Sequence, residues 1–273
     1  MKKLVCFLCA FIVLGSVAVA DTKPAKIGAL TYIGSDEDGV KRWTEQVAEA
    51  EGKEAGYVNP HSIVLFDNLT SMLMALRAGQ IDRFGICSTT GAYIAARNPD
   101  IKVLDKHYKA ILGYSLAMLE KDKSQIEAIN EAIVAMKADG SLDKLVDEYI
   151  TQRKGEPTPV YPQKIDGADT LKIAITGDLP PMDCILSDGT PAGFNVAFLG
   201  ELTKRIKKNF RIVSIDSAAR ATSLSSGNVD VLFWTQGTFN ENGEKLPYPL
   251  DHMDGVAISI PYFQDRRVGV TMK

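Results

Sequence analysis

Two short patterns occur twice in the chain at nearly the same separation. The pattern Leu-x-x-Gly-x-Ile-Asp at residues 76–82 returns as Leu-x-x-Gly-x-Val-Asp at residues 224–230, an offset of 148 residues. The pair Lys-Ile at residues 26–27 returns at residues 172–173, an offset of 146 residues. A helix that stops at a glycine and leads into a strand is a unit of an α/β fold, so the repetition predicts two similar α/β units.

Strands and helices alternate within each unit. In the first unit, apolar runs predict strands over residues 26–33, 62–66 and 81–87, with helices after residue 38, over 69–78 and, beyond a turn at 88–91, over 92–97. Ser35 or Asp36 would cap the first of these helices. In the second unit, an alternating apolar run begins at Leu171 and an amphipathic helix follows Gly193. This alternation predicts mostly parallel sheets with helices on both faces.

The segment between the two units predicts a strand, two helices and a linker. Residues 113–119 form an apolar strand, and residues 124–150 carry two helices broken at Asp139-Gly140. Residues 151–169 hold three prolines and little apolar periodicity, which indicates a linker. The chain ends on an apolar strand at residues 267–273.

The first twenty residues have the layout of a secretory signal peptide. Two lysines at positions 2 and 3, an apolar run over residues 4–14 and Ala18-Val19-Ala20 give its three parts, with an uncleaved membrane anchor as the alternative. We therefore expect a periplasmic protein. The formal net charge of −3 offers no basic surface for nucleic acid.

The remaining chemistry-bearing residues are sparse. Cys87 and Cys184 lie in different halves of the chain, so they either pair or stay as two thiols, and the three histidines are scattered. Phosphate-binding glycine loops, nucleophile elbows and paired catalytic carboxylates are absent from the sequence. We expect no metal, no cofactor and no catalytic residue.

Several segments resemble the polar-amino-acid family of periplasmic solute-binding proteins, the receptors of ABC importers. LKIAITGDLPPMDCILSDGTPAGFNVAF (171–198), SLSSGNVDVLFW (223–234) and Ile260-Pro261-Tyr262 resemble the family's first lobe, and AIVAMKADGSLDKLVDEYI (132–150) resembles its closing helices. The resemblance implies a two-lobed α/β binding protein with a hinge between its lobes. It also implies a monomer that is not an enzyme, that binds a small molecule and that has a membrane permease as its partner.

The order of the pieces is rotated relative to the family, which indicates a circular permutation. The expected division is a signal peptide at 1–20, a lobe resembling the family's second at 21–115, closing helices at 116–150, a linker at 151–169, a lobe resembling the first at 170–265 and a hinge strand at 266–273. We expect the hinge strand to meet the segment before Lys26 and to pair beside the strand at 113–119. The alternative is a fused pair of half-proteins that exchange lobes between chains.

The ligand is expected in a cleft where the carboxyl ends of the strands of both lobes converge. The family's usual carboxylate-binding arginine is missing from residues 235–245, and Cys87 occupies the place of its ammonium-binding aspartate. Arg220 is the candidate substitute for the arginine, with a solvated arginine as the alternative. Asp178 is the candidate for the ammonium, with an aspartate that bonds only its own turn as the alternative.

Other side chains at the same strand ends complete the predicted site. Trp234, taken as lying at a strand end, would stack on a ligand. The remaining candidates are Thr235, Tyr32, Ser35, Ser88, Thr89 and Met182. Cys87 is a further candidate because it occupies the place of the family's aspartate.

These observations predict an exported receptor for an amino acid or related small carboxylate. A dehydratase-like enzyme on the same fold is one alternative, with Asp178 or Asp183 as its acid or base. A module that signals its ligand state to a membrane receptor is the other.

Overall fold

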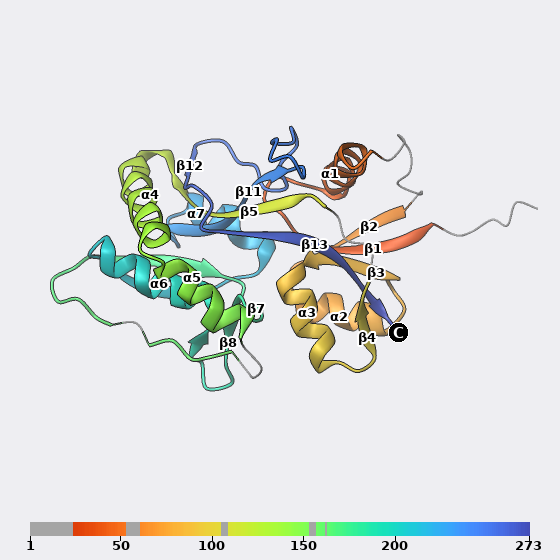
Figure 1. Ribbon diagram of the computed structural model, residues 1–273, viewed down its shortest axis with the longest axis horizontal. Helices are drawn as coiled ribbons and strands as arrows, with labels where there is room; N and C mark the ends of the chain where they lie inside the picture. The colour runs from red at the N-terminus through yellow and green to blue at the C-terminus, as the bar shows by residue number, and fades with distance from the viewer. Residues whose placement is uncertain (1–23, 53–60, 105–108, 153–156, 162) are drawn as a thin grey trace, which may run out of the picture.

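The computed structural model describes residues 24–52, 61–104, 109–152, 157–161 and 163–273. The predicted signal peptide lies outside these residues. The described chain forms two lobes, each built on its own sheet, and a long strand that runs through both (Figure 1).

The N-terminal lobe holds a mixed sheet with three helices. Its strand β1 lies between β2 and β3 and is parallel to both. The strands are β1 (Ala25–Leu30), β2 (His61–Phe66), β3 (Arg83–Cys87) and β4 (Ile101–Val103), and the helices are α1 (Glu37–Ala50), α2 (Leu69–Arg77) and α3 (Ser88–Arg97).

The central lobe is built on a second mixed sheet. Its strand β6 lies between β10 and β11, parallel to both, and β5 is antiparallel to β11 and β12. The strands are β5 (Ile111–Leu119), β6 (Thr170–Ile175), β10 (Asn209–Ser214), β11 (Val231–Phe239) and β12 (Val256–Ile258). A small antiparallel sheet beside it contains β7 (Asp178–Leu179), β8 (Asp183–Ile185) and β9 (Pro191–Ala192).

Helices pack against the central sheet. The α-helices are α4 (Lys123–Ala138), α5 (Ser141–Val146), α6 (Phe194–Arg205) and α7 (Arg220–Ser225), with 3-10 turns η1 (Glu120–Asp122) and η3 (Ser217–Ala219) and a π-helical turn η2 (Asp147–Thr151). The break at Asp139-Gly140 is confirmed, because Gly140 has a φ of 75° there. The largest core cluster includes Phe198 stacked on Tyr262 at 4.3 Å between ring centroids.

Strand β13 (Phe263–Met272) connects the two sheets. Its residues 263–266 pair with β5, whereas residues 267–272 pair with β3 and β4. Figure 1 shows this strand crossing from the central lobe to the N-terminal lobe, where the chain ends. The predicted side-by-side pairing of the two hinge strands, β5 and β13, is confirmed. The expected contact with the segment before Lys26 stays a prediction, because residues 1–23 lie outside the described residues; within them, the end of β13 pairs with β3 and β4.

The sequence repeat corresponds to the same hydrogen-bonded joint in both lobes. Asp82 accepts from the backbone N–H of Lys26 at 2.7 Å, and its own N–H donates to the Lys26 carbonyl at 2.9 Å. Asp230 makes the same pair of bonds with Lys172, both at 2.8 Å. Each aspartate therefore fixes the start of the first strand of its unit, which is why the two patterns recur at nearly equal offsets.

Two helix starts differ in how well the sequence predicts them. Asp36 caps α1 by accepting from the Gly39 N–H at 2.8 Å, as predicted. Helix α3 begins at Ser88, so the predicted turn over 88–91 was wrong. The reason is tertiary: the carboxylate of Asp265, on β13, accepts from the Thr89 N–H at 2.9 Å and satisfies the first turn of the helix.

Candidate functional site

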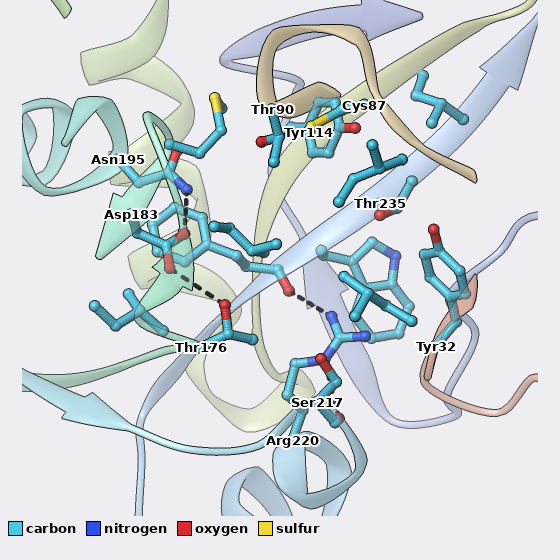
Figure 2. A pocket seen from close by; sticks show the side chains of 18 of the residues that line it. Tyr32, Cys87, Thr90, Tyr114, Thr176, Asp183, Asn195, Ser217, Arg220 and Thr235 are labelled. Atoms are coloured by element: carbon cyan, nitrogen blue, oxygen red, sulfur yellow. Dashed lines mark hydrogen bonds between the residues drawn. The ribbon is translucent and has the colours of Figure 1, made fainter. Parts of the chain in front are cut away.

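A cavity of about 130 Å³ lies between the two lobes. Side chains from both sheets, from both hinge strands and from the loops after β1 and β6 line it, and most of them are apolar. Figure 2 shows its polar groups in two places: Asp183, Asn195 and Thr176 lie on one side, and Arg220, Ser217 and Tyr32 lie toward the other.

Asp183 is a buried carboxylate at one side of the cavity, only 3% exposed. It accepts hydrogen bonds from the Gly177 N–H at 2.9 Å, the Asn195 Nδ2 at 2.8 Å and the Thr176 hydroxyl at 3.3 Å. Burial raises the pKa of Asp183 to about 6, although these donors act in the opposite direction. No described cation pairs with this carboxylate. Tyr262 extends the network, because its hydroxyl donates to Asn195 Oδ1 at 2.9 Å.

Arg220 lines the other side of the cavity, and the protein satisfies its guanidinium completely. Its two Nη atoms donate to the carboxylate of Asp251 at 3.1 and 3.5 Å. Its other N–H groups donate to the carbonyls of Ser217, Phe233 and Thr31 at 3.1 to 3.2 Å. These five hydrogen bonds match the five N–H groups of a guanidinium, so none is left for a ligand.

Asp251 pairs with Arg220 and also bonds to the backbone of two separate segments. Its side chain has no exposed surface, and it also accepts from the backbone N–H groups of Ile33 at 2.6 Å and Thr235 at 2.8 Å. The carboxylate thereby joins the loop after β1 to β11. The role predicted for Arg220 as a carboxylate clamp stays a prediction, and in this conformation its charge is already neutralised.

Arg267 is a second arginine on the cavity wall, and its surroundings differ. It is 4% exposed, and it donates to the Tyr32 hydroxyl at 2.7 Å and to the Gly85 carbonyl at 3.1 Å. Its guanidinium carbon lies 5.2 Å from the ring centroid of Trp43. No ion pair joins Arg267 to a carboxylate of the described residues. A buried cation therefore remains without a counter-charge of its own.

Cys87 and Tyr114 contribute weakly acidic groups. Burial, reinforced by the charge of Asp265, raises the pKa of the Cys87 thiol to about 11, and burial raises the pKa of Tyr114 well above its ordinary value. Both groups are therefore protonated at neutral pH. Cys87 forms no disulfide in the described structure, and neither does Cys184, which is not among the cavity-lining residues.

Six of the ten predicted site residues line the cavity. They are Tyr32, Cys87, Met182, Arg220, Trp234 and Thr235. The other four, Ser35, Ser88, Thr89 and Asp178, are not among its lining residues. Ser35 donates to the Leu250 carbonyl at 2.5 Å, and Ser88 and Thr89 both bind the carboxylate of Asp265. The hydroxyls of Ser35 and Ser88 are thus used in the framework.

Asp178 joins the two lobes outside the cavity. Its Oδ2 accepts from the Thr70 N–H at the start of α2 at 3.2 Å, and its buried Oδ1 has no hydrogen-bond partner among the described residues. Desolvation by burial raises the pKa of Asp178. The predicted alternative of a carboxylate that bonds only its own turn is not what the structure shows.

Trp234 lies within a strand, so the expectation that it marks a strand end was wrong. Strand β11 continues to Phe239 because its antiparallel partner β5 extends the ladder past a bulge between Gln236 and Thr238. Trp234 is 3% exposed and lines the cavity from this position.

The sequence interpretation missed Arg267, Asn195, Tyr262 and Asp251. Arg267 and Asp251 could have been found from the sequence, because each is a charged residue in an apolar strand or loop. A charged residue in such a place needs a partner or a ligand if it is buried. Asp183 was considered only as an acid or base for the alternative enzyme. The described residues contain neither a cluster of His, Cys, Asp and Glu that could hold a metal nor a helix long and apolar enough to cross a membrane.

One family model matches the chain. Residues 171–242 match bacterial extracellular solute-binding proteins, family 3, which confirms the resemblance over that segment. No curated protein sequence matches the chain.

Several solved structures are similar to the chain at low identity. The ligand binding component of an ABC-type import system from Staphylococcus aureus, solved with zinc bound, is 15% identical over 91% of this chain and 66% of its own, with a TM-score of 0.46. The GluR0 ligand-binding core complexed with L-glutamate is 11% identical over 93% and 86%, with a TM-score of 0.43. A putative L-cystine ABC transporter from Listeria monocytogenes is 12% identical over 92% and 83%, with a TM-score of 0.41.

Proposed function

We propose that this chain, whose residues 171–242 match family 3 of the bacterial extracellular solute-binding proteins, is a periplasmic receptor for a small polar metabolite. The cavity between the lobes is the observation that carries the proposal. It is lined from both lobes and contains buried groups of opposite charge. A ligand in this position would contact both lobes at once and favour their closed arrangement.

An amino acid or a related small carboxylate is the ligand class we propose. The apolar wall of the cavity carries hydrogen-bonding groups at defined places, as small-molecule sites usually do. Delivery to the permease of an ABC importer would follow, as the family resemblance implies. The working step would then be closure and opening about the hinge strands β5 and β13.

We also propose that the chain is a circular permutant and works as a monomer. The N-terminal lobe and the last strand share one sheet, whereas residues 111–258 supply the other strands of the central lobe. Exchange of lobes between two chains would instead give a dimer. The mass of the purified protein in solution distinguishes these arrangements, and a stable dimer would contradict the proposal.

A thermal-shift screen tests the receptor function. The purified chain is screened against amino acids, small dicarboxylates, polyamines and sugars. A ligand at one hundred times its dissociation constant adds about 2.7 kcal/mol to the free energy of unfolding, which shifts the melting temperature measurably. We expect a shift with an amino acid or small carboxylate.

Two tryptophan substitutions show whether the shift arises in the cavity. Leu179 is a half-buried lining residue, so Leu179→Trp fills part of the cavity and should abolish the shift. Val134 is 57% exposed on α4, so Val134→Trp should leave the shift intact. The absence of a shift with every compound class, or an equal shift in both variants, would contradict the proposal.

An enzyme remains a second candidate because of Asp183. A buried cavity carboxyl with a pKa of about 6 has the protonation behaviour of an acid or base poised near neutrality. A dehydratase-like activity would use it to move a proton on a bound carboxylic acid. Turnover of prephenate or arogenate that is lost in Asp183→Asn would support the enzyme, whereas binding without turnover supports the receptor.

A further inference from the structure

Two opposite charges line the cavity without an ion-pair partner among the described residues. Arg267 reaches it from β13 and Asp183 from β8. The two charges lie near different tyrosines. Burial is the main cause of the raised pKa of Tyr114, and the charge of Arg267 lowers that pKa. Burial is also the main cause of the raised pKa of Tyr262, and the charge of Asp183 raises it further. Burying a lone charge is costly, so each needs a compensating group in the cavity.

The contrast between the two arginines identifies which one is available. All five N–H groups of Arg220 have acceptors, and Asp251 neutralises its charge. Arg267 has two acceptors, Tyr32 and Gly85, both neutral and both on the cavity wall. A planar guanidinium with unused N–H groups is suited to a carboxylate, which it can bind through two parallel hydrogen bonds.

Gly85 makes room for this guanidinium. A Cβ at position 85 would lie 2.5 Å from Nε and 2.8 Å from an Nη of Arg267. The backbone of β3 at Gly85 therefore contacts the guanidinium directly, and the Arg267 side chain has room beside the cavity. Any larger residue would have to displace the charged group from this position.

We propose that the ligand is amphoteric, with its anionic group on Arg267, its cationic group on Asp183 and an apolar body against the cavity wall. This inference rests on the receptor function proposed above and replaces Arg220 as the anion-binding residue. The apolar wall, which includes Ile86, Leu179 and Phe233, would contact the ligand's body. Both buried charges would then be neutralised by a single small molecule.

Matched compounds test the two charged contacts separately. The probes are the apolar and aromatic L-amino acids and, for each, the acid that lacks the amino group and the amine that lacks the carboxyl group. Affinities are measured by titration calorimetry. Because a charge-assisted hydrogen bond is worth about 1.5–3 kcal/mol, we expect the wild type to prefer an amino acid over each analogue by roughly 10- to 150-fold.

Substitutions should remove these preferences one at a time. Arg267→Met should abolish the preference over the amine, and Asp183→Asn should abolish the preference over the acid. Gly85→Ala should act like Arg267→Met although it leaves the arginine in place. The matched controls are Arg211→Met and Asp188→Asn, because both side chains are exposed and neither lines the cavity.

The pH dependence of binding by the wild type gives a further test. Asp183 faces Asp178, Tyr262, Asn195 and Thr176, and burial gives it a pKa of about 6. A cationic ligand group binds the ionised carboxylate, so affinity for the amino acid should fall as the pH falls through about 6. The same titration in Asp183→Asn should be nearly flat and would show whether Asp178 contributes.

The outcomes separate the inference from the receptor function. A preference over the amine that survives in Arg267→Met but disappears in Arg220→Met would overturn the inference and leave the receptor standing. Binding of only neutral or only anionic compounds by the wild type would do the same. If the wild type binds no compound of the probe set or of the wider screen, both the inference and the receptor function fail.

Discussion

Asp251→Ala should be among the most destabilising single substitutions in the described chain. The side chain is completely buried and accepts four hydrogen bonds, two from Arg220 and one each from the backbone N–H groups of Ile33 and Thr235. Removal of one member of a buried ion pair costs about 3–5 kcal/mol, and a buried N–H left without an acceptor costs about 1–3 kcal/mol. These costs overlap because the groups share one site, so we expect a loss of about 4 kcal/mol.

Urea unfolding, analysed by linear extrapolation, measures this loss as a change in the free energy of unfolding. Asp254→Ala is the matched control, because Asp254 is exposed three residues along the same loop and should change stability by less than about 0.5 kcal/mol. The Arg220→Met and Asp251→Ala substitutions should also be non-additive in a double-mutant cycle. A loss below about 1 kcal/mol in Asp251→Ala would refute the view that this carboxylate joins the loop after β1 to β11.

Three further substitutions test local features. The raised pKa of Asp183 means that between about pH 4 and pH 6 the folded protein keeps a proton which the unfolded chain has lost. The free energy of unfolding, relative to that of Asp183→Asn, should therefore fall by about 3 kcal/mol as the pH rises from about 4 to about 6 and stay level at higher pH. Urea unfolding across this pH range measures the difference between the two proteins, and a difference that does not change with pH would contradict the prediction. Gly193→Ala should cost about 2–4 kcal/mol, since Gly193 has a φ of 102° and a Cβ would lie 2.6 Å from the Pro181 carbonyl oxygen. Gly200→Ala, inside α6 with only Val160 within 4 Å, should instead stabilise slightly, and equal effects would count against the argument.

The sequence predicted the α/β elements well because local chemistry determines them. Each repeated aspartate caps the strand that opens its own unit, and each repeated glycine ends the preceding helix with a positive φ, 66° at Gly79 and 72° at Gly227. These features depend on residues of one unit. They leave a readable pattern whatever the order of the units along the chain.

The errors arose where a distant segment decides the structure. Helix α3 begins early because Asp265, more than 170 residues away, accepts from its first turn. Strand β11 runs past Trp234 because β5 extends the ladder. The pairing of Asp251 with Arg220 is of the same kind. The sequence interpretation considered only Arg220, and the position of Asp251 in the structure shows that the charge of Arg220 is neutralised while, among the described residues, that of Arg267 is not.

The hinge strand provides a test of the proposed circular permutation. If the chain has been cut in a hinge crossing, the end of β13 is held to the N-terminal lobe only by non-covalent pairing, and that pairing must be as firm as the core. Val268 and Val270 are 2% and 0% exposed within the ladder with β3, and the carbonyl of Gly269 accepts from the Leu104 N–H at 2.8 Å.

We therefore expect the amide hydrogens of residues 268–272 that belong to this ladder to exchange slowly. Opening that costs about 4 kcal/mol would slow exchange by about 10³-fold relative to an unstructured peptide. The hydrogen-bonded amides of β6 in the central lobe serve as the internal standard. Exchange of the terminal strand at the rate of a free tail, with β6 still protected, would mean that a cut hinge cannot transmit closure between the lobes.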